Sequence, residues 1–323
     1  MVLTPNFKVV VNDKDMTEVI RANLISITYD DKEGDESDEI SIIVHGIYNA
    51  PKFGDKIELY LGYSKLYKCG SFALQTVDRD FKAHTTEIRA TAVNFADTKT
   101  KVKKSRSWEN TTLFGIARTI ASEQGLSFKS NGEDVNIVSK LQQDMSDIEF
   151  IYSLAFEFGF LGCVKNGTLI IGKKVDIKGA NANTSGISGG SKFELDMSEL
   201  YSFEISEAYR NTYKSVVIQW QEISSGQIKS LRAGSGEPSY KMRVAQPKSD
   251  SEAFSIADAK LNDLLKGGVS GKCKVAGANI VCGGSVSFKN TGASDIDGRV
   301  FGIKSVSHSL NSSGYTIEVE FER

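Results

Sequence analysis

The sequence predicts a mainly β fold in which two similar β-modules flank a small α+β insert. Three observations support this fold class. Short runs rich in β-branched and aromatic residues fill the first hundred residues and return after residue 200. Between 110 and 172, apolar residues recur with a helical period instead. The first β region and the end of the chain also share a spaced pattern of residues, which indicates an internal repeat.

The first β region divides into short segments separated by Gly, Asn and Asp, a spacing typical of an all-β sandwich or barrel. We expect strands at 7–11, 24–30, 39–45, 55–63, 70–81 and 86–95. Ile40, Ile42 and Val44 alternate along one of these segments. Each strand is therefore expected to bury one of its faces.

The insert is predicted to hold two helices and a hairpin. A stripe of Leu113, Ile116, Ala117, Ile120 and Ala121 predicts the first helix, with Asn110 or Thr111 as its N-cap and Gly125 as its stop. Ser146 and Glu149 fit a capping box that opens the second helix. Asn166-Gly167 then predicts a tight hairpin turn.

These patterns predict four segments. The first β-module covers 1–105, the insert 106–177, a linker rich in Gly, Ser and Asn 178–192, and the second β-module 193–323. The second module contains one helix at about 251–266, stopped by Gly267.

The internal repeat aligns Val77 with Val306, which places Phe72 on Phe301, Leu74 on Ile303 and Ile88 on Ile317. A strand ends in Val in both copies, and a polar turn and a Thr-led strand follow. Upstream, the segment 24–44 has a looser partner in 200–220. We interpret this pattern as a duplication of one β-module.

Composition excludes several classes of protein. A formal net charge of −2 argues against a surface built entirely for nucleic acid. No apolar run is long enough for a membrane helix, and no secretory signal is visible. The four cysteines are scattered without a C-x-x-C pair, which favours reduced thiols in a protein made in the cytoplasm.

A search for catalytic chemistry finds no convincing site. The one G-x-S-x-G match, at 186–190, lies in the predicted linker and not on a strand-to-helix turn. His45, His84 and His308 each lie in or beside a strand pattern, where a histidine is more often a tolerated surface residue than a base. The usual zinc, calcium and phosphate-loop spacings are missing. We expect no catalytic residue, no metal and no cofactor.

Two charged stretches have open interpretations. The acidic stretch 30–39 is either a solvated hairpin tip or an arm that contacts a neighbouring subunit, with Asp30, Asp31, Glu33, Asp35, Glu36 and Asp38 as its candidate interface residues. The basic stretch 99–106 lacks the interleaved aromatics of a single-strand binder, so we favour a connection between modules. The alternative is a stretch that binds phosphate through basic residues such as Lys101, Lys103, Lys104 and Arg106.

Four segments resemble the late-control protein D family, the baseplate hub proteins of contractile phage tails, which is related to the hub part of type VI secretion spike proteins. They are "TPNFKVVVNDKDMTEVIRANLISITYDDKEGDESDEISIIV", "KVKKSRSWENTTLFGIARTIASEQGL", "DMSDIEFIYSLAFEFGFLGCVKNGTLII" and "DGRVFGIKSVSHSLNSSGYTIEVEFE". They appear in the family's order and cover nearly the whole chain.

The resemblance implies two tandem β-barrels, each like a tail-tube subunit, in a homotrimer that forms a ring of approximate sixfold symmetry. It implies a tail tube or tube-initiator protein, a central spike and a tape-measure protein as partners, with DNA only as passing cargo and no membrane partner. In such a ring Lys101, Lys103, Lys104 and Arg106 are candidates for the lining of the DNA channel, although we favour the connection between modules. We expect the chain in the tail or baseplate of a virion or tail-like particle, with no spike extension after Arg323 and no enzymatic activity. The alternatives are a tail-associated cell-wall hydrolase and a tail module that binds host-surface glycans.

Overall fold

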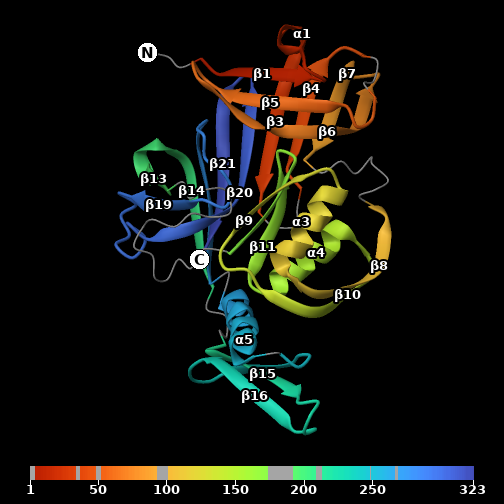
Figure 1. The fold of residues 1–323 in the computed structure, drawn as a ribbon. Helices are drawn as coiled ribbons and strands as arrows, with labels where there is room; N and C mark the ends of the chain where they lie inside the picture. Colours follow the sequence, from red (N-terminus) through yellow and green to blue (C-terminus); the bar gives the residue numbers. More distant parts are fainter. Residues whose placement is uncertain are drawn as a thin grey trace.

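The chain is mainly β, and strands from both ends of the sequence join in one 13-stranded sheet (Figure 1). A computed structural model describes residues 4–33, 37–48, 52–92, 101–173, 192–208, 213–247, 249–265 and 268–323. Apart from Lys192, the predicted linker lies outside the described residues, as does Gly267. Neither module closes into a barrel within the part of the chain that the structure describes.

The first β-module contains all of the strands that the sequence predicts before residue 92. They are β1 (Asn6–Val11), β3 (Leu24–Lys32), β4 (Glu39–His45), β5 (Lys56–Gly62), β6 (Leu66–Asp80) and β7 (Thr85–Thr91), with the short β2 (Lys14–Asp15) and α1 (Thr17–Arg21) after β1. Neighbouring strands follow the order β3-β4-β7-β6-β5-β1. Inward-facing Ile40, Ile42 and Val44 are buried, as their alternation predicts.

The second β-module repeats this strand order. It consists of β13 (Lys192–Asp196), β14 (Leu200–Glu207), β18 (Val269–Ala276), β19 (Ser285–Lys289), β20 (Val300–Asn311) and β21 (Gly314–Glu322). Its order, β14-β18-β21-β20-β19-β13, matches the first module strand for strand. The last pair differs, because β13 runs parallel to β19 whereas β1 runs antiparallel to β5.

The repeat extends to hydrogen-bond register. Ile57 faces Phe72 in the first module, and Val286 faces Phe301 in the second, at a constant separation along the chain. Gly54 and Asp55 bracket Leu74 with two backbone bonds, as Gly283 and Gly284 bracket Ile303. Both modules then carry an irregularity at the next step, between Leu74 and Thr76 and between Ile303 and Ser305. Shared bulges are specific features of a fold, so the two modules have the same architecture.

Two details of the sequence alignment are wrong. Val77 faces Ile88, whereas Val306 faces Val319, so the counterpart of Ile88 is Val319 and not Ile317. Beyond these valines the pairing continues to Asn311 opposite Gly314 in the second hairpin but only to Asp80 opposite Thr85 in the first. The longer pairing and the tighter turn shift the spacing by two residues without changing the buried face. Upstream, the counterpart of β4 is β18 and not the segment 214–220, because an additional unit separates β14 from β18.

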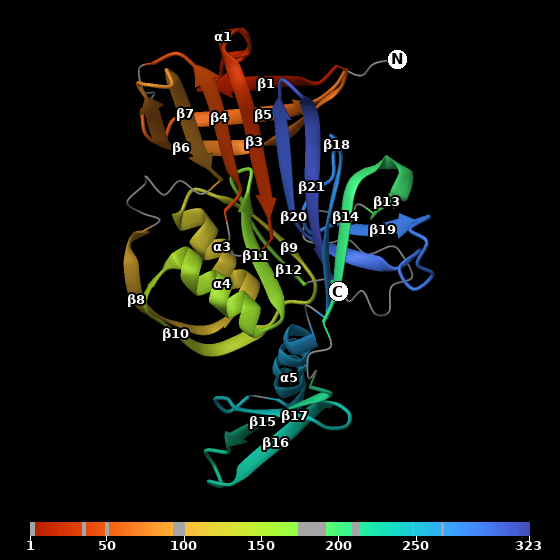
Figure 2. The same ribbon diagram turned by 180° about the vertical axis from the view of Figure 1, so that it is seen from behind.

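That additional unit, called the α5 unit below, was not separated from the second module by the sequence patterns. It contains β15 (Ser215–Gln221), β16 (Ile228–Gly234), β17 (Ser239–Arg243) and the predicted helix, α5 (Asp250–Leu265). Its three strands form their own sheet, and Val216, Ile218 and Trp220 pack against α5 residues such as Ala257. Figure 2 shows the unit at the opposite end of the molecule from β1.

The insert packs two helices between two small sheets. β8 (Lys103–Thr112) pairs with β10 (Asn136–Ser146), and β11 (Phe160–Lys165), β12 (Thr168–Lys173) and β9 (Ser127–Asn131) form the other sheet around α3 (Leu113–Glu123) and α4 (Asp147–Glu157). The predicted capping box of Ser146 and Glu149 is confirmed. The Asn166-Gly167 turn is also confirmed, with both residues at positive φ.

The predicted N-cap of the first helix is wrong. Thr112 caps α3 by accepting a hydrogen bond from the Gly115 amide, whereas Asn110 and Thr111 still belong to β8. The boundary predicted between 105 and 106 also falls inside β8. The basic stretch thus continues into the strand β8. This strand forms because β10, a distant segment of the sequence, provides its hydrogen-bond partners.

The two β-modules share one hydrophobic core, which explains why they form one sheet. Phe7, Ile40 and Leu59 of the first module belong to the same buried cluster as Phe288 and Phe321 of the second. Rings of Phe203, Phe288, Phe301 and Phe321 lie within 4.7–6.1 Å of their neighbours. Contacts of this kind stabilise a core beyond the area they bury.

Candidate functional site: the junctions between modules

The two β-modules are joined edge to edge by β3 and β20. Their antiparallel pairing runs from Ser305 opposite Lys32 to Asn311 opposite Ser26. At its middle, Tyr29 stacks on His308 with ring centroids 5.1 Å apart. The joint continues the hydrogen-bonded sheet from one module into the other without interruption.

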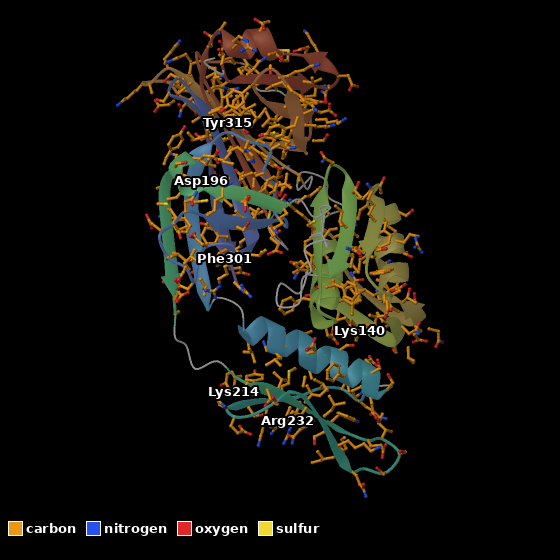
Figure 3. All side chains as sticks on the ribbon, turned by 90° about the vertical axis from the view of Figure 1, so that its left-hand side faces the viewer. Lys140, Asp196, Lys214, Arg232, Phe301 and Tyr315 are labelled. Atoms are coloured by element: carbon orange, nitrogen blue, oxygen red, sulfur yellow. The ribbon has the colours of Figure 1, made fainter. Side chains whose placement is uncertain are left out.

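His308 lies at the centre of a buried polar cluster at this joint. Its Nδ1 lies 2.8 Å from the Tyr315 hydroxyl and 3.3 Å from the Tyr67 hydroxyl, which also bond to each other. Figure 3 shows Tyr315 where the second module meets the first. His308 is 1% exposed, so the prediction of a surface residue is wrong. Burial lowers the pKa of His308 to about 4, so the ring is neutral at pH 7.

A second junction fastens the insert to both β-modules through Lys165. Its ammonium group, at the end of β11, pairs with Asp31 of β3 and lies 3.5 Å from Asp38. The other Asp31 oxygen accepts a 2.8 Å hydrogen bond from the Cys282 amide in the second module. Asp38 also accepts a hydrogen bond from the Lys32 amide. Three parts of the chain therefore meet at one ion cluster.

Burial makes this cluster sensitive to the loss of a partner. Asp31 and Asp38 are 2% and 5% exposed. Burial raises the pKa of Asp38 to about 7, against the opposing charge of Lys165. Burial alone would lower the pKa of Lys165, but the charges of Asp31 and Asp38 hold it above its ordinary value. Since two carboxylates share one ammonium, removing Lys165 would leave both uncompensated.

The described residues of the acidic stretch, 30–33 and 37–39, are therefore buried or half-buried and not solvated as its composition suggests. Asp31 continues the inward-facing alternation of Ile27 and Tyr29, a signal that could have placed it inside. Asp30 and Glu33 are half-buried, and Asp35 and Glu36 lie outside the described residues. Nothing in the local sequence points to Lys165, which is 134 residues from Asp31.

The basic stretch meets acidic partners within the insert. Lys104 lies 2.7 Å from Asp147 and 3.0 Å from Glu123, and Arg106 bonds to the same two carboxylates at 2.9 Å each. The Arg106 guanidinium also lies 4.2 Å from the centre of the Trp108 ring. Although burial acts to raise the pKa of Asp147, hydrogen bonds from Lys104 and Gln142 hold it below its usual value.

This arrangement gives Lys104 and Arg106 a structural role, since they join β8 to both helices of the insert. Lys103 is exposed and lies 3.7 Å from Asp144, and Lys101 is exposed. The four candidates for a channel lining therefore divide into two half-buried residues, Lys104 and Arg106, and two exposed ones, of which Lys103 pairs with Asp144.

The thiols and metal-binding groups offer little reactive chemistry. All four cysteines are free and buried, and burial raises the pKa of Cys163 and of Cys273 to about 12. Within the described ranges, no group of three His, Cys, Asp or Glu side chains could hold a metal ion. No described helix has the length and apolar character needed to cross a membrane.

The arrangement of modules is shared with solved structures of tail proteins. The tail protein from Neisseria meningitidis MC58 superposes with a TM-score of 0.74 at 12% identity, over 99% of this chain and 97% of that protein. The Escherichia coli c3393 protein, a type VI secretion component similar to bacteriophage T4 tail proteins, gives a TM-score of 0.55 at 10% identity, over 93% and 73%. The chain therefore has the fold of phage tail proteins and of their type VI relatives.

Sequence relatives define the class more closely. No family model matches the chain. The probable baseplate hub protein of Escherichia phage 186 is 23% identical over an alignment 368 residues long. The alignment covers 99% of this chain and 93% of that protein. The probable baseplate hub protein of Escherichia phage P2 is 26% identical over 225 residues, covering 68% and 57%. These relatives confirm the resemblance: the chain is a homologue of phage baseplate hub proteins.

Proposed function

We propose that this chain is the structural baseplate hub of a contractile phage tail or tail-like particle. Three copies form a ring of approximate sixfold symmetry that joins the tail tube and tape-measure protein to the central spike. The observation that carries this proposal is the duplicated β-module, whose two copies share strand order, register and bulges. Three chains with two equivalent modules each supply six similar units.

The two sides of such a ring would differ in symmetry. The β6–β7 and β20–β21 turns occupy equivalent positions in the two modules, at the same end of the paired strands. This end is called the first side of the ring. At the opposite end of the strands, the second side of the ring, the β3–β4 connection is short. The equivalent β14–β18 connection contains the whole α5 unit. The first side presents six similar turns and fits a sixfold tube. The second side presents three α5 units and three inserts and fits a threefold spike.

A structural role also agrees with the chemistry of the buried groups. A hydrolase needs a carboxylate pair, or a Cys and a His, within reach of substrate. His308 is buried and neutral, and burial raises the pKa of Cys282 above its ordinary value, as it does for Cys163 and Cys273. We therefore propose a protein without enzymatic activity and without a cofactor.

The charged candidates keep restricted roles in this proposal. Lys101 and Lys103 are the basic residues that remain available to face a DNA-filled lumen. Asp30, Glu33, Asp35 and Glu36 remain candidates for contacts between subunits or with the tube. Asp31 and Asp38 already have partners in their own chain.

Native mass spectrometry of the purified chain, alone and with its spike partner, tests the proposed hub. We expect trimers, formed alone or on addition of the spike. A chain that stays monomeric in both samples would contradict the proposal. Degradation of purified peptidoglycan, abolished by one substitution in a defined active residue, would favour the hydrolase instead.

A further inference from the structure

The ion cluster at Lys165 holds an amine and two carboxyl groups together with little water around them. Lys165 Nζ contacts Asp31 Oδ1 directly and lies 3.5 Å from Asp38 Oδ1. The side chains of Lys165, Asp31 and Asp38 are 16%, 2% and 6% exposed. By contrast, Lys229 contacts Glu222 at the surface of the α5 unit, where its side chain is 51% exposed. Burial therefore separates the Lys165 cluster from an ordinary surface ion pair.

We propose that Lys165 and Asp31 join in an intramolecular isopeptide bond, with Asp38 as the group that transfers protons between them. A bond forms from Lys165 Nζ to Asp31 Cγ, and the bond from Cγ to Oδ1 breaks. The ammonium and the carboxylate yield one amide and one water molecule, so atoms and charge balance without an oxidant or a cofactor. The reaction happens once within each chain and is not an enzymatic activity. It does not depend on the proposed ring.

Asp38 is suited to proton transfer because burial raises its pKa to about 7. Burial also acts to lower the pKa of Lys165, although the two carboxylates hold it above its ordinary value. The amine becomes neutral by giving a proton to the Asp31 carboxylate that it contacts, which removes two buried charges at once. Protonated Asp38 then donates to Asp31 Oδ1 as it leaves as water, and takes a proton back from the nitrogen.

The second oxygen of Asp31 already has the hydrogen-bond donor that this reaction needs. Its Oδ2 accepts a 2.8 Å hydrogen bond from the Cys282 amide. Negative charge gathers on Oδ2 when the nitrogen attacks Cγ, and a backbone N–H at this distance stabilises that charge. The fold thus positions a nucleophile, an acid and a donor around one carbon, which is the arrangement that accelerates a reaction between two groups.

The thiols and aromatic groups near the cluster are uncharged at neutral pH. Burial raises the pKa of Cys163 to about 12 and raises the pKa of Cys282 and Tyr29 above their ordinary values. Burial lowers the pKa of His308 to about 4. Because a thiol reacts as its thiolate, neither cysteine competes with the Lys165 amine for Asp31.

The bond ties the insert to the first β-module at a place where apolar packing does not. Buried apolar residues of the β-modules form one cluster, and those of the insert form another. Lys165 and Asp31 are 134 residues apart in sequence. A covalent link across such a long loop restricts the unfolded chain and keeps the insert attached.

The intact mass of the purified full chain tests the bond. We expect a mass about 18 Da below that calculated from the sequence, because one water molecule leaves. Trypsin should release the segments 22–32 and 141–173 as one branched peptide, joined through Asp31 and Lys165. A parent chain at its calculated mass, or with the two segments separate, would overturn the inference.

Substitutions separate this bond from dehydration elsewhere in the chain. Lys165→Arg keeps the positive charge but lacks the primary amine, so it should have its calculated mass. Lys229→Met, at the exposed pair, is the matched control and should keep the mass deficit. Asp31→Asn should still form the amide with ammonia as the leaving group, a loss of about 17 Da. A deficit of one water that persists in Lys165→Arg would overturn the inference.

Asp38→Asn tests the proton-transfer role, since it keeps the shape of the side chain and removes the acid. Bond formation should slow at least about a hundredfold, so that freshly purified chains have their calculated mass. A circular dichroism spectrum equal to that of the parent shows that the fold is retained. Complete bond formation in fresh Asp38→Asn would overturn the role of Asp38. The parent mass and the branched peptide decide on the bond itself, whether or not this variant folds.

Discussion

The two β-modules have the same strands, yet equivalent positions in them have different surroundings. Asp31 in the first module is buried and paired with Lys165 of the insert. Its counterpart in the second module is Glu207, which lies on the surface and pairs with Arg299 at 3.0 Å. Asp38 corresponds in the same way to the apolar Val269. The comparison shows that the two modules share the strand framework, whereas contact with the insert decides where charge is buried.

The largest expected effect comes from removing the central cation of the buried cluster. Lys165→Met should lower the free energy of unfolding by about 3–5 kcal/mol, because it leaves two buried carboxylates without their partner. Denaturant unfolding measures this change. The matched change in the second module, Arg299→Met, should cost about 1 kcal/mol or less, since its ion pair is partly exposed.

A combined variant sharpens this test. Adding Asp31→Asn and Asp38→Asn to Lys165→Met removes the uncompensated charges and should recover part of the lost stability. Equal costs for Lys165→Met and Arg299→Met would show that burial does not distinguish the two modules.

A change in pH is expected to have a smaller effect on stability, with opposite signs for Asp38 and His308. The folded pKa of Asp38, about 7, lies above its ordinary 3.8, so the stability it contributes is present below pH 3.8 and is lost as the pH rises to 7. The folded pKa of His308, about 4, lies below its ordinary 6.5, so its contribution is present above pH 6.5 and is lost as the pH falls to 4.

Substitution separates these two groups. Relative to the parent chain, the melting temperature of Asp38→Asn should rise as the pH increases from 4 to 7. That of His308→Gln should rise, relative to the parent, as the pH decreases from 6.5 to 4. Thermal unfolding followed by circular dichroism across this range gives both differences. Parallel curves for a variant and its parent would mean that the substituted group does not titrate as described.

The smallest effect on the shared sheet is expected from removing the α5 unit. Replacing 209–267 with the sequence of 33–38 would give the second module a connection like that of the first. The unit has its own core, so hydrogen-exchange protection of β18, β20 and β21 should change by about 1 kcal/mol or less. Complete loss of protection in these strands would show that the second module depends on the unit in order to fold.

Sequence patterns predicted the local elements well where neighbouring residues decide them. The capping box at Ser146, the Asn166-Gly167 hairpin and the helix that became α5 all depend on contacts within a few residues. The repeat that aligns Phe72 with Phe301 was also predicted, because the apolar residues around each Phe have the same spacing along the sequence. Patterns failed for β8, whose polar residues carry little strand signal until β10 pairs with them.

By itself the sequence determined the mainly β class, the two similar modules and the resemblance to tail hub proteins, because periodicity and spacing are written along the chain. Only the tertiary structure decided that the modules form one sheet and that Asp31 and Asp38 are buried against Lys165. Those features depend on residues more than a hundred positions apart. Their free energy comes from burial and pairing that no local pattern contains.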